Sequence, residues 1–340
     1  MKTLRKIYMI LALAAPCVLF PACNDEWTEE QYEKTVAFVK SGYTDIYLKY
    51  DATSGVVSYK VPVLVNGSAG NDQNVIVTVA LDPDTLVMLN YERFRLRKDL
   101  YFKLLKPEHY TLKSETVTIP AGENTAVLDV DFSLQGLDLV DKHILPLQIT
   151  ATSVYEPSPR KWYKKTMMRI VPFNDYSGNY MPTSGNITFI DDNGDPVLDV
   201  NGNTTIIPLE DYRDARVVDE NTVFFYAGVV EEQARDRARY KVQMRFNPDG
   251  TLTLWADDPD IKFTQINDPT VNFNNYSVVT AFDQALPYLE HRYTIVRLDY
   301  SFTDVSHPSY QVRYHVQGSL TMERKRNTLI PEEDQQFIFD

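Results

Sequence analysis

Aromatic side chains are the residues of this sequence that are best suited to ligand binding. The 340-residue chain contains 22 Tyr, 16 Phe and 3 Trp, and most of them are expected in hydrophobic cores. Four have polar or loop neighbours instead: Trp255 beside Thr251 and Thr253, Phe224 and Tyr226 on one strand face with Thr222, and Trp162 between Lys161 and Tyr163. Flat rings pack against the apolar C–H faces of sugars. We therefore predict carbohydrate contacts at these four residues, with a half-buried strand position or a contact between domains as the alternative.

The sequence carries no pattern typical of a catalytic or metal site. Its five histidines include no pair at i, i+4 with a glutamate between them, which a zincin requires. The acidic run at residues 191–195 would need Gly at its sixth and Glu at its twelfth position to form an EF-hand, and Pro196 and Gly202 stand there. A hairpin turn explains this run better. The prediction is no catalytic residue, no metal and no cofactor.

Two further sets of polar residues are interpreted as solvated. His315 falls on the polar face of a predicted strand, so we expect it to be exposed to water. Arg235, Arg237 and Arg239 alternate among acidic neighbours, which is typical of an exposed strand face.

The first residues are predicted to form an export signal. Three basic residues precede an apolar run over residues 7–20, which is shorter than the ~20 residues that span a bilayer. This arrangement is typical of a cleaved signal peptide. Phe20, Pro21, Ala22 and Cys23 then resemble a bacterial lipobox, which implies a signal peptide at residues 1–22 and lipidation of Cys23. The alternative is an ordinary secretory signal with an incidental cysteine.

Acidic residues follow the cysteine. Residues 23–34 form a predicted acidic tether that resembles the surface-export signal of Bacteroidetes-type lipoproteins, which implies an outer-membrane, lipid-anchored protein facing the cell exterior. Residues 1–22 hold three basic and no acidic side chains, so their removal changes the net charge from −13 to −16. This charge excludes nucleic acid as an expected partner. We expect contact with the membrane through the lipid anchor only.

The first half of the mature chain has the alternating strand pattern that is typical of a β-sandwich. Val57, Tyr59, Val61, Val63 and Val65 alternate with other residues, and turn signals separate further strands. A short helix is predicted from Asp82, Pro83 and Asp84, with Leu86, Leu89 and Phe94 on one face. The order of this helix start, the turn at residues 119–123 and the run Leu145-Pro146-Leu147 resembles an N-terminal Ig-like domain of Bacteroidetes surface lipoproteins. The resemblance implies an Ig-like β-sandwich over residues 35–172.

The alternation and turns of the second half predict an antiparallel β-barrel or sandwich. Val242, Met244 and Phe246 alternate with polar residues, a turn follows at residues 247–250, and Gly318 marks a predicted bulge or bend. The segment from Tyr176 to Tyr180, together with later turns, resembles the C-terminal domain of the same lipoproteins, which implies a calycin-like barrel over residues 173–328. Residues 329–340 form a predicted acidic tail. The fold class is therefore all-β.

The resemblance also implies a function. It indicates a non-catalytic, cell-surface glycan-binding lipoprotein of a polysaccharide-utilisation system, which binds an oligosaccharide or polysaccharide and passes it to an outer-membrane glycan transporter. One alternative is a structural or adhesive protein that binds a protein partner by strand addition. A third is an exported glycosidase, which needs two carboxylates ~5–10 Å apart. Because the chain has 47 acidic residues, such a pair is expected by chance and is not evidence for this alternative.

Replacement of Cys23 tests the anchor. We expect Cys23→Ser to release the protein from membranes, because the acyl chains attach through this thiol and no other feature of the sequence predicts membrane insertion. Membrane fractionation of cells that express each form measures the change. A variant that is processed and retained like the wild type would contradict lipidation at this residue.

Overall fold

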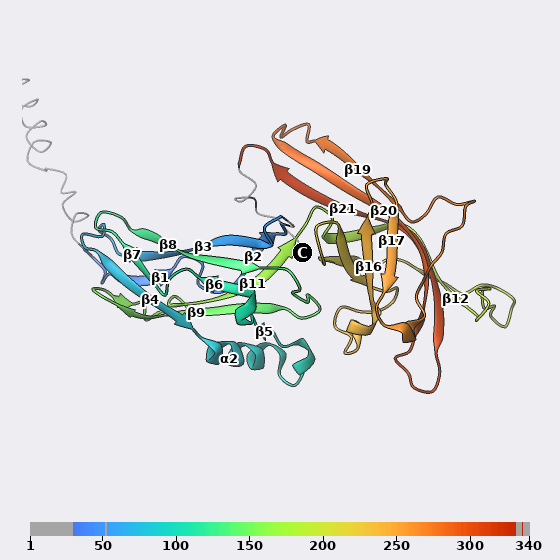
Figure 1. The fold of residues 1–340 in the computed structure, drawn as a ribbon, viewed down its shortest axis with the longest axis horizontal. Helices are drawn as coiled ribbons and strands as arrows, with labels where there is room; N and C mark the ends of the chain where they lie inside the picture. Colours follow the sequence, from blue (N-terminus) through green and yellow to red (C-terminus); the bar gives the residue numbers. More distant parts are fainter. Residues whose placement is uncertain (1–29, 52, 331–334, 336–340) are drawn as a thin grey trace, which may run out of the picture.

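The protein has an all-β architecture of two domains, as the sequence predicts (Figure 1). The computed structural model describes residues 30–51, 53–330 and 335. The predicted signal peptide, Cys23 and most of the predicted tail lie outside the described residues. No helix among the described residues is long and apolar enough to cross a membrane.

Two sheets pack face to face in the first domain. One has the order β10-β1-β3-β8-β6, with β1 at Thr35–Phe38, β3 at Val56–Asn66, β6 at Tyr110–Leu112, β8 at Thr125–Ser133 and β10 at Glu156–Pro157. The other has the order β2-β11-β9-β4-β7, with β2 at Gly42–Lys49, β4 at Val75–Leu81, β7 at Thr116–Ile119, β9 at His143–Thr152 and β11 at Lys165–Phe173. A short strand β5, Lys103–Leu104, also pairs with β9.

Apolar side chains at alternate positions of the strands fill the space between these sheets. Val61, Val63 and Val65 of β3 enter the same core as Leu128 and Val130 of β8, because every second side chain of a strand points to one face. The sequence led us to expect antiparallel strands throughout. The pairing of β2 with β11 is parallel instead, since the chain crosses from one sheet to the other at residues 39–41 before β2 begins.

A helix lies outside the sandwich, at the predicted position. Helix α2 spans Pro83–Phe94, and the Asp82 carboxylate accepts a hydrogen bond from the Thr85 backbone N–H at its N-terminus. This cap satisfies a backbone donor that has no partner within the helix. Leu86 is buried, and Leu89 and Phe94 pack beside it. The 3₁₀ turns η2, Lys98–Leu100, and η3, Pro107–His109, continue the chain toward β6.

The second domain is a strongly curved sheet. Its order is β17-β16-β15-β14-β12-β21-β20-β18, with β12 at Gly178–Ile190, β14 at Arg213–Val217, β15 at Thr222–Tyr226, β16 at Lys241–Phe246, β17 at Leu252–Ala256, β18 at Thr264–Gln265, β20 at Leu289–Asp304 and β21 at Val312–Asn327. Two additional strands, β13 at Ile206–Pro208 and β19 at Asn275–Phe282, pair with β12 and β20. The 3₁₀ turns η4 and η5 span Arg237–Tyr240 and Pro259–Ile261.

One side chain connects the two ends of this sheet. The Gln265 amide accepts a hydrogen bond from Leu254 N–H at 2.7 Å and donates to the Leu252 carbonyl at 3.2 Å. Gln265 belongs to β18 and both partners belong to β17, so the sheet forms a nearly closed barrel. Gly318 lets two strands approach closely, because a Cβ there would lie 2.8 Å from the Ser184 carbonyl oxygen.

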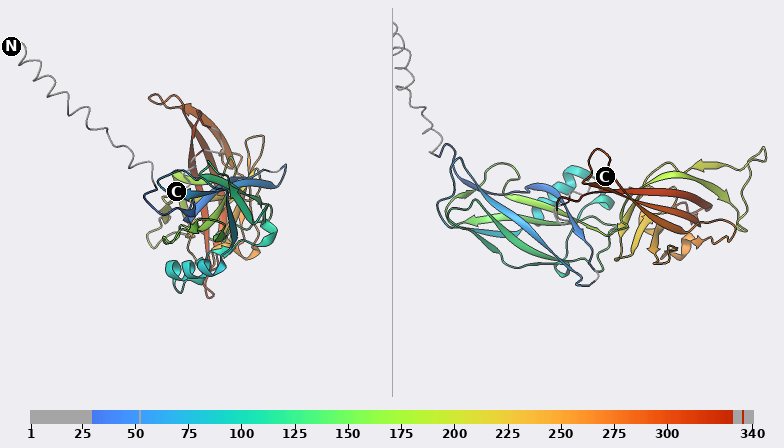
Figure 2. Two further views of the ribbon diagram at one scale, coloured as in Figure 1. Left: turned by 90° about the vertical axis from the view of Figure 1, so that its left-hand side faces the viewer. Right: turned by 90° about the horizontal axis from the view of Figure 1, so that it is seen from above.

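The two domains lie end to end (Figure 2). Strand β11 leads from the sandwich into the barrel, and Asn174 in the connection donates hydrogen bonds to the Asp219 and Thr222 carbonyls. Arg97 donates to the Gln233 carbonyl at 2.6 Å, and Arg237 donates to the Asp99 carbonyl at 3.0 Å. Arg237 is therefore buried at the junction, and the interpretation of this residue as solvated was wrong because the sandwich covers it.

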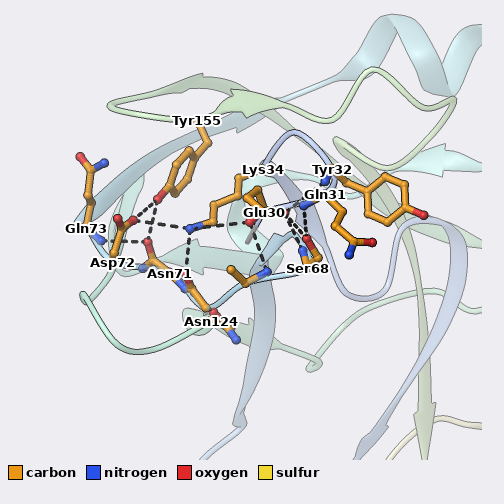
Figure 3. A network of polar contacts seen from close by, with 12 residues as sticks. Glu30, Gln31, Tyr32, Lys34, Ser68, Asn71, Asp72, Gln73, Asn124 and Tyr155 are labelled. Carbon is orange, nitrogen blue, oxygen red and sulfur yellow. Dashed lines mark hydrogen bonds and ion pairs between the residues drawn. The ribbon is translucent and has the colours of Figure 1, made fainter. Parts of the chain in front are cut away.

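The end of the predicted acidic tether is fixed to the sandwich (Figure 3). The Glu30 carboxylate accepts hydrogen bonds from the Ser68 hydroxyl and backbone N–H, both at 2.7 Å, and from Ala69 N–H at 3.2 Å. Lys34 donates to the Gly70 carbonyl and lies 3.5 Å from Asp72. Residues 30–34 thus belong to the folded domain, because the loop at residues 68–72 supplies donors and acceptors that match their charges.

This attachment predicts a pH dependence. The hydrogen bonds from Ser68 lower the pKa of Glu30 from 4.5 to about 2. A lowered carboxyl pKa means that the interaction is complete above pH 4.5 and is lost as the pH falls toward 2. An NMR titration of the Glu30 carboxyl should therefore have its midpoint near 2.

Amide exchange provides a second measurement at neutral pH. Glu30→Gln should speed hydrogen exchange at Ser68 and Ala69, because the amide oxygen that replaces the carboxylate is a weaker acceptor. Glu33→Gln is the matched control and should leave both rates unchanged. A Glu30 midpoint near 4.5, or equal rates in the two variants, would contradict the attachment.

Candidate functional site

A cleft between the two domains combines charged side chains with aromatic rings. It consists of two adjoining hollows of about 140 and 210 Å³, which share Asp141, Lys142, Asp214 and Arg216. Lys142 lies just before β9 and Arg169 in β11, whereas Asp214 and Arg216 lie in β14. Ligand sites favour such positions between domains. We call this site the interdomain cleft.

Strand alternation brings the barrel residues to the cleft. In β15, Val223 and Phe225 point into the barrel core, so Phe224 and Tyr226 point outward toward the sandwich. The register places Arg216 of β14 directly opposite Phe224. Phe224 and Tyr226 pack with Leu139 of the sandwich. This apolar contact forms one wall of the cleft and fixes the neighbouring charges.

Arg216 is the centre of the charge network. Its guanidinium donates two hydrogen bonds to the Glu232 carboxylate, at 2.5 and 3.3 Å, and lies 3.6 Å from Asp214. It also lies 5.4 Å from the Tyr226 ring centroid. A fork-shaped pair of this kind fixes both partners in direction as well as distance. Arg216 therefore holds the Glu232 carboxylate by hydrogen bonds and attracts the Asp214 carboxylate by charge.

Loss of water shifts the pKa of three groups in the cleft toward their neutral forms. Burial raises the pKa of Asp214, although Arg216 opposes the effect. Lys142 as a whole is exposed, but partial loss of water around its ammonium lowers its pKa, and the positive charges of Arg169 and Arg216 add to this. The pKa of the Tyr226 hydroxyl rises to about 12 through burial. Clusters of shifted pKa values in a cleft are typical of functional sites.

Arg169 contributes a positive charge to the wall of the cleft. It donates a hydrogen bond of 2.7 Å to the Asp45 carboxylate through one terminal nitrogen. Its Nε is buried and has no hydrogen-bond partner among the described residues, although Arg169 lines the smaller hollow. A buried donor without a partner is costly, but this nitrogen has almost no surface open to the cleft, so a ligand could reach it only if neighbouring side chains moved.

Comparison with known proteins identifies the relatives of this chain. Residues 27–153 match the family model of a domain of unknown function, DUF4973, and residues 164–321 match a second family model, which describes a C-terminal domain. A solved structure of a multidomain protein including DUF1735 from Bacteroides ovatus is 37% identical; the match covers 91% of this chain and 100% of that one, with a TM-score of 0.75. The chain belongs to this family of multidomain Bacteroides proteins.

Two other solved structures have a similar sequence identity and TM-score. An auxiliary nutrient binding protein from Bacteroides thetaiotaomicron VPI-5482 is 36% identical, covering 87% of this chain and 95% of that one, with a TM-score of 0.75. A protein of unknown function from Bacteroides ovatus is 30% identical, covering 92% and 97%, with a TM-score of 0.73. No curated protein matches the chain.

In this family member, the four aromatic residues selected from sequence occupy different environments. Phe224 and Tyr226 are only 1% and 2% exposed, so neither can stack on a sugar through an open ring face, and this part of the prediction needs correction. They occupy the contact between domains because the sandwich covers the outer face of β15. The edge of Tyr226 still lines the larger hollow.

The two tryptophans lie apart. Trp255 lies on the same outer barrel face, half-buried, with the Arg245 guanidinium 5.4 Å from its ring. Its neighbours Leu252 and Leu254 enter the barrel core. Trp162 precedes the start of β11, at the end of that strand away from the barrel. The structure therefore does not bring Trp162 together with the other three residues.

His315 differs from its predicted environment. Its Nε2 lies 2.7 Å from a carboxylate oxygen of Asp299, and Gln317 donates to the other oxygen. Asp299 is 2% exposed, so His315 covers a buried acid on the outer barrel face rather than being merely solvated. The described residues contain no cluster of three or more His, Cys, Asp or Glu side chains that could hold a metal ion.

Stability measurements can separate the two kinds of aromatic position. We expect Phe224→Ala to lower the free energy of unfolding by about 3–5 kcal/mol, because it leaves a cavity at the domain contact. Trp255→Ala should lower it by about 1 kcal/mol or less, because the ring is partly exposed. Urea unfolding measures both. An equal loss for the two variants would mean that Trp255 is a core residue.

Proposed function

We propose that the protein is a non-catalytic nutrient-binding protein of the cell surface, and that it binds an oligosaccharide in the interdomain cleft. The observation that carries the proposal is the position of Lys142, Arg169, Asp214 and Arg216 around one cleft with aromatic rings beside them. The 36%-identical relative described as an auxiliary nutrient binding protein supports the same conclusion.

The chemistry of the cleft fits a polyhydroxylated ligand. Each sugar hydroxyl can donate one hydrogen bond and accept others. Asp214 and Glu232 would accept from ligand hydroxyls, while Lys142 would donate to ligand oxygens. The pKa shifts of Asp214 and Lys142 show that the fold stabilises their charges poorly. New hydrogen bonds from a ligand would compensate for that lack.

The position of Arg216 supports the non-catalytic part of this proposal. A glycosidase would need two carboxyl groups on either side of the scissile bond, and Asp214 and Glu232 are the two carboxylates beside Arg216 in the cleft. However, one nitrogen of Arg216 lies 2.5 Å from Glu232 and 3.6 Å from Asp214. The guanidinium thus bridges the two carboxylates in the space that the sugar carbon would need, which favours binding over hydrolysis.

The remaining parts of the proposal concern location and partner. Lipid on Cys23 would hold the protein at the outer membrane, facing the exterior, and a bound oligosaccharide would pass to an outer-membrane glycan transporter. The proposal does not require the barrel to insert into lipid, because acyl chains alone anchor a folded domain.

Protein binding by strand addition is a second candidate. Among the described residues, strand β19 pairs with β20 along its length, and its other edge has one isolated bridge, from Asn275 to Thr251. Val278, Val279 and Phe282 are 39%, 49% and 58% exposed. Val278 and Val279 point to opposite faces, so this strand is open on both faces and along one edge (Figure 1). Such an edge can accept a strand of another protein.

A glycan array followed by calorimetry tests the primary proposal. We expect the wild type to bind at least one class of neutral oligosaccharide. Lys142→Gln and Asp214→Asn should each weaken binding by about 1.5–3 kcal/mol, which is typical for a hydrogen bond to a charged group. The release of reducing ends, measured in parallel, should stay at background.

Asp192→Asn is the matched control, since this exposed residue lies on the hairpin after β12, away from the cleft. It should leave glycan affinity unchanged. Absence of glycan binding by the wild type, or equal losses in Asp214→Asn and Asp192→Asn, would overturn the assignment of the cleft. Release of reducing ends that Asp214→Asn abolishes would establish the glycosidase instead.

A further inference from the structure

One loop of the sandwich concentrates positive charge in an otherwise acidic protein. Residues 160–164, which we call the basic loop, have the sequence Arg-Lys-Trp-Tyr-Lys and contain no carboxylate. The whole chain carries a net charge of −13. All three cations are exposed and Tyr163 is 38% exposed, while Trp162 is half-buried. This composition differs from that of the interdomain cleft, where charges of both signs lie together.

The basic loop has a defined conformation. Its turn is closed by hydrogen bonds from Tyr163 N–H to the Arg160 carbonyl and from Lys165 N–H to the Trp162 carbonyl. Trp162 has a φ of 73°, a left-handed conformation that costs energy for a bulky residue. Lys161 lies 5.4 Å from the Trp162 ring centroid, and Arg160 lies 5.7 Å from that of Tyr163. Cations and rings therefore form one joint surface.

The basic loop lies beside the point where the described chain begins. Arg160 and Tyr163 line a hollow of about 390 Å³ together with Tyr32, Glu33 and Thr35. Tyr32 is nine residues from Cys23 in sequence. Nine extended residues reach at most about 30 Å. An acyl chain on Cys23 would therefore hold the basic loop within that distance of a membrane surface.

We propose that the basic loop is a membrane-contact surface for the anionic headgroups of phospholipids. Amphipathic rings such as those of Trp and Tyr favour the headgroup region of a bilayer, and nearby Lys and Arg side chains gain from negatively charged lipids. Membrane contact thus extends beyond the lipid anchor. The proposal uses the lipidation of Cys23 for its geometry, but the affinity of the loop is a property of the folded sandwich.

The net negative charge of the chain does not prevent this contact. Charges further apart than about 8–10 Å are largely screened at physiological salt, so a surface responds mainly to its nearest charges. Lys40 is exposed and follows β1, whose last residue, Phe38, donates a backbone hydrogen bond to the Tyr163 carbonyl. Glu33 is the carboxylate that shares the hollow with Arg160. The local balance is positive.

Vesicle sedimentation tests the proposal without the acyl chain. A chain that begins at Asn24 retains every described residue and lacks Cys23, so its result is independent of lipidation and of glycan binding. We expect it to bind vesicles of phosphatidylcholine and phosphatidylglycerol at 3:1, but not vesicles of phosphatidylcholine alone, and to dissociate at 0.5 M NaCl. The triple variant R160Q/K161Q/K164Q should bind the anionic vesicles about a hundredfold more weakly.

The variant K60Q/K98Q/K103Q is the matched control, because it removes the same charge from exposed positions elsewhere. It should bind like the wild type. Equal losses in the two triple variants, or no binding by the wild type, would overturn the proposal. Displacement of the protein by 10 mM glycerol phosphate would also overturn it, since that result indicates a site for a small soluble anion.

Tryptophan emission provides a measurement that does not depend on removing charges. Contact with anionic vesicles should shift the emission of the wild type to shorter wavelength, because the Trp162 ring leaves water. Trp162→Phe should remove this shift while vesicle binding is largely retained. A shift of the same size in Trp162→Phe would show that the basic loop does not enter the headgroup region.

Discussion

The contact between the outer face of β15 and the sandwich fixes the geometry of the whole molecule. Phe224 and Tyr226 bury their rings against Leu139, so the barrel cannot rotate about the connection after β11 without exposing them to water. Burial of one large side chain contributes roughly 1.5–3 kcal/mol. Arg97 and Arg237 add polar bonds across the same junction. The distances among the charges of the interdomain cleft depend on this contact.

Burial gives the cleft its electrostatic character. The raised pKa of Asp214 means that the folded protein loses stability as the pH rises from 3.8 through the raised value. The lowered pKa of Lys142 has the mirror effect, since stability increases as the pH rises through the lowered value toward 10.5. Between these limits the folded state holds both groups in their charged forms, which the partly desolvated cleft favours less. A site that binds ligands gains specificity from such groups, because a ligand that leaves them unpaired binds poorly.

The sequence predicts local structure well and the cleft poorly, for one physical reason. Alternation in β16 and β20 and the cap of α2 are properties of neighbouring residues, so they can be recognised without the fold. The same alternation placed Phe224 on the outer barrel face correctly, but only docking of the sandwich shows that this face is buried. Arg169 and Arg216 come from different domains, and no pattern along the chain indicates their proximity. The attachment of Glu30 could not be predicted for the same reason, because its partner Ser68 lies 38 residues away in the sequence.

The two ends of the sandwich are suited to different tasks. Strand β11 begins next to the basic loop and ends at the barrel, so its nine residues separate the two regions by roughly 30 Å. The end near Glu30 carries the cations of the basic loop, which have no ion-pair partner among the described residues, and the other end carries charges that are paired within each domain, such as Arg169 with Asp45 and Arg216 with Glu232. Charges that are exposed and unpaired respond to a charged surface and to salt. Charges that are ordered by bidentate pairs and burial favour a ligand with matching hydrogen bonds. A rigid sandwich between them keeps the interdomain cleft away from whatever surface the basic loop contacts.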